Sequence, residues 1–211
     1  MKNYEFIIAG LPDIEPDFEN PSLDFDIMLD QIRAHLDKND LKKINWLLFG
    51  LNDDNLSSHF YFNVKKSKSR FLQQYFRFDL MLRNIQAAYV ARRENLNPDN
   101  YLIGENEIIE SLKKSKSPDF GIAADVEYAT KLLQIFEMKD VLEREKALDS
   151  LKWEEAKRIC TFNLLDLDVI LSFILRAHIL KRWKALDKKH GEELFRQYVH
   201  EMRNSYKKNK E

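Results

Sequence analysis

The chain has 211 residues, of which 44% are hydrophobic and 33% charged, and its formal net charge at pH 7 is −1. This composition allows a sizeable core and lacks the strongly basic footprint of most nucleic-acid-binding proteins. The single cysteine, Cys160, excludes an internal disulfide and a cysteine-rich zinc site.

Residues that favour turns are scarce. Glycine and proline together supply ten of 211 residues, less than half of the roughly 12% found in average proteins. Many short strands need many turns, so we expect a mainly all-α protein, a multi-helix bundle with long helices. Three prolines follow good N-cap residues, and the pairs Asn20-Pro21, Asn97-Pro98 and Ser117-Pro118 are predicted helix starts.

The N-terminal stretch YEFIIAGLP (residues 4–12) is the one piece with strand character. It is too short to form a sheet alone, so we expect any strand pair to use FYFNV, residues 60–64. Four alternating acids follow it, at Asp13, Glu15, Asp17 and Glu19. They lack the central glycine of a calcium-binding loop, so a solvated acidic loop is the favoured interpretation.

Hydrophobic periodicity predicts the next helices. Two shorter helices are expected over residues 23–36 and 41–51, the second capped by Asn39 or Asp40. A long helix is expected over residues 69–95, with a core face of Phe71, Tyr75, Phe78, Leu82, Ile85 and Tyr89. Another is expected over 121–138, with a core face of Ile122, Val126, Ala129, Leu133 and Phe136.

The stretch FNLLDLDVILSFILRAHILKRW (residues 162–183) is apolar all round from Leu164 to Leu175. Such a helix is usually buried centrally, and the alternative is a face partly shared with a partner. Asp166 or Asp168 is expected at its N-terminus, where a carboxylate meets free N–H groups. Its uncharged run is too short to span a membrane. Trp153 and Trp183 are predicted to be buried beside this helix.

The C-terminal stretch EELFRQYVHEMRNSY (residues 192–206) predicts a last helix, and charge is distributed in blocks along the chain. Residues 1–60 carry −7, residues 61–98 carry +6, residues 99–155 carry −6, and residues 176–211 carry +6. Neutralisation between helices is the favoured explanation, and orientation on charged partners is the alternative. The block 176–211, including Lys207, Lys208 and Lys210, is the expected contact segment.

No motif assigns a catalytic, cofactor-binding or metal-ligating residue. The DFG at 119–121 lacks every other kinase motif, and no phosphate-binding glycine loop occurs. The five histidines have no metal-ligand spacing, and Cys160 is expected to be a small buried hydrophobe. We therefore expect a protein that is not an enzyme and has no cofactor.

The stretch HFYFNVKKSKSRFLQQYFRF (residues 59–78) mixes aromatic and basic side chains, as single-strand-binding grooves do. However, Phe71, Tyr75 and Phe78 already belong to the predicted core face of a helix. Nucleic acid is therefore not expected as the main partner.

Two parts of the sequence resemble a known family. NYEFIIAGLPDI at the start, and the stretch from EREKALDSLKW to ELFRQYV, are similar to bacterial proteins encoded within V-type (A-type) ATPase operons. In chain order, the second part contains a Leu-x-Trp motif and then an apolar run that begins with an acidic pair. An Arg-Trp pair, a Leu-Asp pair, a Gly and a Phe follow. The resemblance implies a distant relation to the all-helical central-stalk component of these ATPases, which links the rotating stalk to the membrane ring. It carries over no functional residue.

The resemblance implies a non-catalytic accessory or central-stalk-like subunit that docks onto other subunits of a V-type ATPase. The alternative is a free-standing helical binding or regulatory protein, with RNA as one ligand. We expect a cytoplasmic protein with no transmembrane segment, and the alternative is a peripheral location at the inner membrane through an ATPase complex. Residues 1–211 are expected to form a single helical domain, and the alternative is two subdomains, 1–98 and 99–211.

Overall fold

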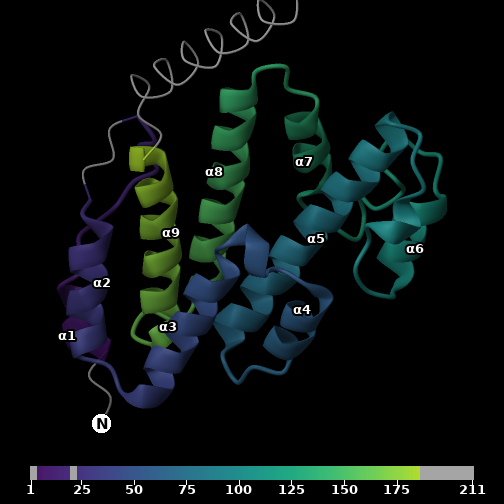
Figure 1. Cartoon of the computed structure of the whole chain (residues 1–211). Helices are drawn as coiled ribbons and strands as arrows, with labels where there is room; N and C mark the ends of the chain where they lie inside the picture. Colours follow the sequence, from purple (N-terminus) through teal and green to yellow (C-terminus); the bar gives the residue numbers. More distant parts are fainter. Residues whose placement is uncertain (1–3, 20–22, 186–211) are drawn as a thin grey trace, which may run out of the picture.

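The structure, a computed structural model, describes residues 4–19 and 23–185, and these residues form helices and loops without any strand (Figure 1). The α-helices are α1 (Tyr4–Ala9), α2 (Phe25–Ala34), α3 (Lys38–Gly50), α4 (Ser58–Lys65), α5 (Arg70–Arg93), α6 (Glu107–Lys114), α7 (Ala129–Phe136), α8 (Val141–Ile159) and α9 (Leu167–Ala185). Two single-turn 3₁₀-helices are η1 (Asp53–Asn55) and η2 (Pro98–Asn100). The all-α prediction is confirmed.

Helix α5 is the main strut of the molecule. It packs against α4, α6, α7, α8 and α9, and in Figure 1 it rises obliquely from the lower centre to the upper right. Helices α8 and α9 lie side by side, and α1 and α2 cover α9 on the side away from α8. Within the described ranges, no helix has both the length and the apolarity needed to cross a membrane.

Helix α9 lies at the centre of the core. Helices α1, α2, α3, α5 and α8 all pack against it, which explains why its apolar side chains point in every direction. Leu171 is completely buried, as are nearly all of its apolar neighbours on α9. Trp153 and Trp183 are also buried. The predictions of a central helix and of two buried tryptophans are confirmed.

The predicted core face of the long helix is confirmed over most of its length. Phe71, Tyr75, Phe78, Leu82 and Ile85 are all buried along α5, and Tyr89 is partly buried. The helix begins where Ser69 accepts a hydrogen bond from the backbone N–H of Leu72 (3.4 Å), so the serine satisfies a donor with no partner in the helix.

The predicted strand pair is wrong, because both segments are helical. Residues 4–9 form α1, which brings the Tyr4 hydroxyl to Asp40 at 2.6 Å and places Ile7 in the core. Residues 60–64 belong to α4, which buries Phe60, Tyr61 and Val64. That spacing follows the helical period rather than the alternation of a strand, and tertiary burial favours it over β-propensity.

Of the three helix starts predicted at prolines, one opens a short helix, one is wrong and one is not described. Asn97-Pro98 opens only η2, and Ser117-Pro118 opens a turn. Phe120 and Gly121 there have φ angles of 57° and 69°, in the left-handed region that a right-handed helix cannot include. The helix predicted over 121–138 therefore shrinks to α7. Asn20-Pro21 lies outside the described residues, so that start stays a prediction.

One boundary prediction is wrong and another is confirmed. Helix α3 is capped by Asp37, which accepts from two backbone N–H groups, and not by Asn39 or Asp40. Helix α9 begins at Leu167, and Asp166 accepts from the backbone N–H of Asp168 at 2.9 Å. The apolar residues that precede Asp166 lie in a loop. The helix predicted over 192–206 and the lysines at 207, 208 and 210 lie outside the described residues.

Candidate docking surface

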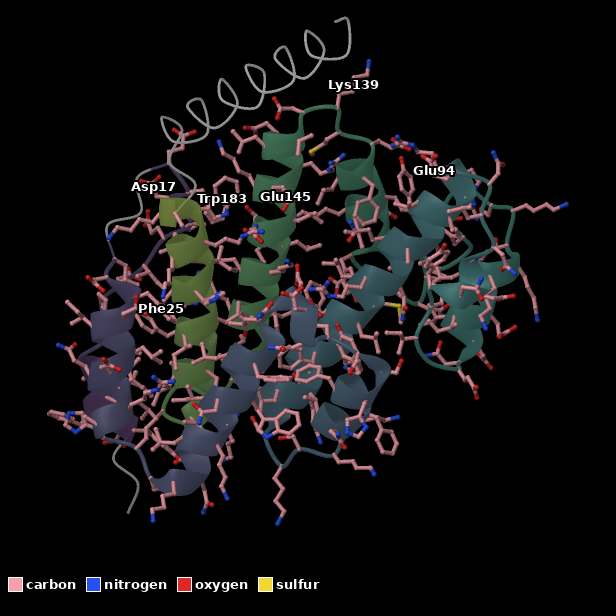
Figure 2. All side chains as sticks on the ribbon, viewed as in Figure 1. Asp17, Phe25, Glu94, Lys139, Glu145 and Trp183 are labelled. Atoms are coloured by element: carbon pink, nitrogen blue, oxygen red, sulfur yellow. The ribbon has the colours of Figure 1, made fainter. Side chains whose placement is uncertain are left out.

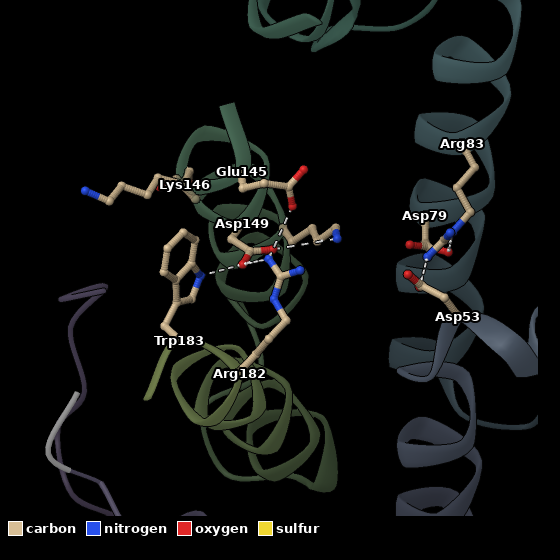
Figure 3. Close-up of polar contacts among 10 residues, drawn as sticks. Asp53, Asp79, Arg83, Glu145, Lys146, Asp149, Arg182 and Trp183 are labelled. Atoms are coloured by element: carbon tan, nitrogen blue, oxygen red, sulfur yellow. Dashed lines mark hydrogen bonds and ion pairs between the residues drawn. The ribbon is translucent and has the colours of Figure 1, made fainter. Parts of the chain in front are cut away.

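Three buried carboxylates each join two separate helices. The first is Asp149 on α8, which accepts a hydrogen bond from the Trp183 indole N–H at 2.7 Å and another from Arg182 (Figure 3). Lys152 lies 3.7 Å from the same carboxylate, and Glu145 lies 3.6 Å from Arg182. Since α9 supplies the indole and the guanidinium, this cluster fixes the position of α9 against α8.

The second cluster surrounds Asp79 on α5. Its carboxylate accepts from the Tyr61 hydroxyl at 2.7 Å. It also accepts from Arg83 Nε at 2.9 Å, and Arg83 donates to Asp53 at 2.6 Å (Figure 3). Burial, reinforced by the charge of Asp79, raises the pKa of Tyr61 above its ordinary value. Burial alone would raise the pKa of Asp53, but Arg83 outweighs it and lowers that pKa.

The third buried carboxylate is Asp40 on α3. It accepts from Tyr4 and, at 3.1 Å, from Lys43. All three clusters combine a buried carboxylate with a phenol or an indole and with a cation, so each charge is both paired and hydrogen-bonded. We assign them a structural role, because each carboxylate is almost completely buried and its partners come from the same helix or from packed neighbours.

The other residues singled out in the sequence are not brought together into a site. Cys160 is buried and donates to the backbone carbonyl of Asp168 at 3.2 Å, and burial raises the pKa of its thiol to about 11. His178 packs edge-on against Phe25, and burial lowers its pKa. Among the described residues, no three His, Cys, Asp or Glu side chains are grouped to hold a metal ion. The acids of the loop 13–19 are exposed, as predicted.

The most organised exposed feature lies on α3. Trp46 and Phe49 are 41% and 50% exposed, and both rings lie 5.8 Å from the buried ring of Phe60. Phe60 packs in turn edge-to-face against Phe76 in the core, at 4.9 Å. We call Trp46 and Phe49, with Phe60 beneath them, the aromatic surface.

Gly50 makes this arrangement possible. A Cβ atom at Gly50 would lie 2.4 Å from the rings of both Phe60 and Phe76, so only glycine lets the end of α3 approach them. The sequence pattern missed the aromatic surface because the helical prediction for 41–51 gave no indication of which rings stay exposed. The spacing of Trp46 and Phe49, three apart on one helix face, was the available signal.

Three other apolar features are exposed. Residues 161–166, between α8 and α9, carry Phe162, Leu164 and Leu165. Val141 and Leu142 lie at the opposite end of α8, near the turn where Figure 2 labels Lys139. A half-open hollow of about 510 Å³ lies between α1 and α2, and Phe6, Leu11, Met28, Ile32 and His35 contribute to its lining.

Comparisons with known proteins give one family. The model of a family described as "Protein of unknown function (DUF2764)" matches residues 50–206. No curated protein and no solved structure matches the chain. The matched region includes Phe60 and the loop 161–166, whereas Trp46 and Phe49 precede it.

Proposed function

This chain belongs to the DUF2764 family of proteins of unknown function, and we propose that it acts as a non-catalytic docking protein of a V-type rotary ATPase. In this proposal it is an accessory or central-stalk-like subunit that binds other subunits of the complex. It binds no nucleotide itself. The observation that carries the docking role is the aromatic surface on α3.

The aromatic surface has the physical character of a binding hot spot. Trp and Phe side chains bury large apolar areas at low entropic cost, and a few such anchors supply most of the affinity of an interface. Because Trp46 and Phe49 already rest on the buried ring of Phe60, little ordering would accompany binding. Rings this exposed and this well supported are typical of a surface that a partner covers.

The scaffold suits a mechanical connector. Helix α5 has 24 residues and therefore spans about 36 Å. The cluster at Asp149 holds α8 to α9, that at Asp79 holds α5 to α4, and that at Asp40 holds α3 to α1, each through buried charged hydrogen bonds. Buried polar networks whose members are all hydrogen-bonded make the structure more rigid, and rigidity is what a mechanical connector needs.

The class of partner rests on the sequence. The stretches at both ends of the chain resemble proteins from V-type ATPase operons, which supports a rotary ATPase component as the partner. A long, helical, rigid body is also what a connector between stalk and membrane ring requires.

The test measures association of the purified chain with the purified rotary ATPase of the same organism, by biolayer interferometry at low and at high salt. The variant Trp46→Ala/Phe49→Ala should bind at least about tenfold more weakly, since truncating one hot-spot residue costs about 2 kcal/mol or more. The matched control, Val141→Ala/Leu142→Ala, removes apolar side chains that are at least as exposed, at the start of α8, and should bind normally.

Circular dichroism checks that both variants fold. Absence of association at either salt concentration, or stoichiometric ATP binding by the chain alone, would overturn the proposal. Equal weakening by both pairs of substitutions would reject the aromatic surface as the anchor.

The alternative is a free-standing helical regulatory protein that binds RNA, and one observation favours it. Lys66 lies 3.8 Å above the exposed ring of Phe62, which begins the basic stretch 62–70. However, Phe71, Tyr75 and Phe78 are buried and cannot stack on bases. Fluorescence anisotropy of a labelled single-stranded RNA, measured as the protein is added, distinguishes RNA binding from ATPase docking. Tight, salt-sensitive RNA binding without ATPase association would favour the alternative.

A further inference from the structure

The loop between α8 and α9 displays apolar side chains to an unusual degree. Phe162 is 94% exposed, Leu164 71% and Leu165 58%. Large apolar side chains scattered singly over a surface are ordinary, but three within four residues on one loop are not. We call residues 161–166 the apolar loop.

The apolar loop is held in place at its base. Asn163 donates its backbone N–H to the carbonyl of Cys160 at 3.0 Å, and Asp166 receives the N–H of Asp168. Arg70, from the start of α5, donates to the carbonyl of Ile159 at 3.1 Å and pairs with Asp168 at 3.1 Å. The three apolar side chains therefore project from an ordered support, and the described part of the chain leaves them uncovered.

Basic side chains are concentrated on the two segments that lead to this base, the turn before Arg70 and the end of α8. Arg70 itself follows the turn 65–69, which Gln73 holds by donating to the carbonyls of Lys65 and Ser67. The end of α8, which leads into the loop, adds two more exposed cations. The basic collar consists of Lys65, Lys66, Lys68, Arg70, Lys157 and Arg158, all exposed.

Acidic groups on the same elements only partly offset the collar. Asp168 is paired with Arg70, and Glu155 is paired with Arg158 at 2.6 Å. Asp166 caps the start of α9. Glu154 pairs with Lys131 on α7, at 2.9 Å, and the charge of Glu127 also acts on Arg158. Arg70 and Arg158 are thus paired with acids, and the positive excess of these segments comes from the four exposed lysines Lys65, Lys66, Lys68 and Lys157.

We propose that the apolar loop is a membrane-inserting anchor for an anionic lipid surface. Phe162, Leu164 and Leu165 enter the boundary between headgroups and acyl chains, and the basic collar contacts the anionic headgroups around them. One apolar group gives only marginal membrane binding, and a polybasic patch beside it supplies the second signal that stable binding requires. This anchor is independent of the proposed ATPase partner.

The shape of the feature favours lipid over a protein partner. Protein hot spots are anchors set in a flat, well-packed patch that excludes water, as Trp46 and Phe49 are on α3. The apolar loop instead presents a protruding ring and two leucines with little protein beside them, and a deformable headgroup layer accommodates such a projection. The surrounding cations match a negatively charged leaflet.

The experiment is flotation of the full chain with protein-free vesicles, so that its outcome is separate from ATPase binding. Vesicles of phosphatidylcholine alone are compared with equal parts phosphatidylcholine and phosphatidylglycerol. The chain should bind the anionic vesicles. Phe162→Ser/Leu164→Ser/Leu165→Ser should weaken binding by more than about tenfold, because the anchor's apolar area is lost. Val141→Ser/Leu142→Ser is the matched control and should bind like the wild type.

Two further measurements separate insertion from simple attraction. Lys66→Glu/Lys68→Glu/Lys157→Glu should reduce binding to anionic vesicles by roughly fivefold for each cation removed. In the Phe162→Trp variant, lipids with brominated acyl chains should quench a larger fraction of the tryptophan fluorescence than in the wild type. The reason is that the indole introduced at position 162 reaches the acyl chains. The proposal would be overturned if the wild type failed to float with anionic vesicles. It would also be overturned if the triple-serine variant floated as well as the wild type.

Discussion

At the residue scale, the polar groups with the largest structural effect are carboxylates that sequence inspection would place on the surface. Asp149 is two per cent exposed, and its partners on α9 sit 33 and 34 residues further along the chain. A helical wheel of α8 shows an acidic residue but not the indole that faces it. The cluster explains why Trp183, with a polar N–H, can be buried at the end of the central helix.

Replacing Asp149 by Ala should lower the free energy of unfolding by about 3 kcal/mol, because the Trp183 N–H loses its acceptor and Arg182 its partner. Asp149→Asn keeps an acceptor for the indole and should cost less. The control is Glu145→Gln, which alters a half-exposed partner of the same Arg182 and should change stability by less than about 0.5 kcal/mol. Urea denaturation measures all three, and equal effects at 145 and 149 would contradict a structural role for this carboxylate.

At the element scale, α9 and the loop before it divide one apolar stretch into two different environments. From Leu167 to Trp183 nearly all apolar side chains are buried against five helices, whereas Phe162, Leu164 and Leu165 face solvent. The two halves have similar composition, so composition does not distinguish them. Asp166 marks the division, because its side chain begins the helix.

A matched pair of substitutions tests this division. Leu171→Ala should cost about 2–5 kcal/mol, because it removes a completely buried side chain and leaves a cavity. Leu165→Ala, the same chemical change six residues earlier, should stay within about 0.5 kcal/mol. Chemical denaturation of the two variants is sufficient, and a large loss at Leu165 would mean that the loop is covered by protein.

At the scale of the whole molecule, buried apolar residues form one continuous cluster that runs from Ile7 on α1 to Trp183 on α9. Helix α5 contributes to it along most of its length and contacts helices from both halves of the chain. A core shared in this way makes it difficult for one half to unfold while the other remains folded.

We therefore expect a single cooperative unfolding transition. Two variants, one keeping only Trp46 and the other only Trp153, report on residues 1–98 and 99–211 respectively. Their fluorescence should change at the same denaturant concentration as far-UV circular dichroism. Separate midpoints for the two tryptophans would instead support the two-subdomain alternative.

The sequence by itself determined the helical class, the core face of α5, the burial of Cys160 and both inner tryptophans, and the central position of α9. These features depend on local periodicity and on the scarcity of turn residues, and both can be read directly from the sequence. The sequence contains no motif that assigns a catalytic residue, and the expectation that the protein is not an enzyme stays a prediction. The partner class also stays a proposal, because it rests on resemblance.

Only the tertiary structure decided the secondary structure of residues 4–9 and 60–64. Both segments have strand propensity, yet they form α1 and part of α4. Burial of Ile7, and of Phe60, Tyr61 and Val64, outweighs that propensity. The tertiary structure also decided which apolar side chains stay exposed on α3 and in the apolar loop. A side chain stays exposed when no other helix passes over it. Contacts between residues far apart in the chain fix the path of each helix, so a local sequence pattern does not predict which faces are covered.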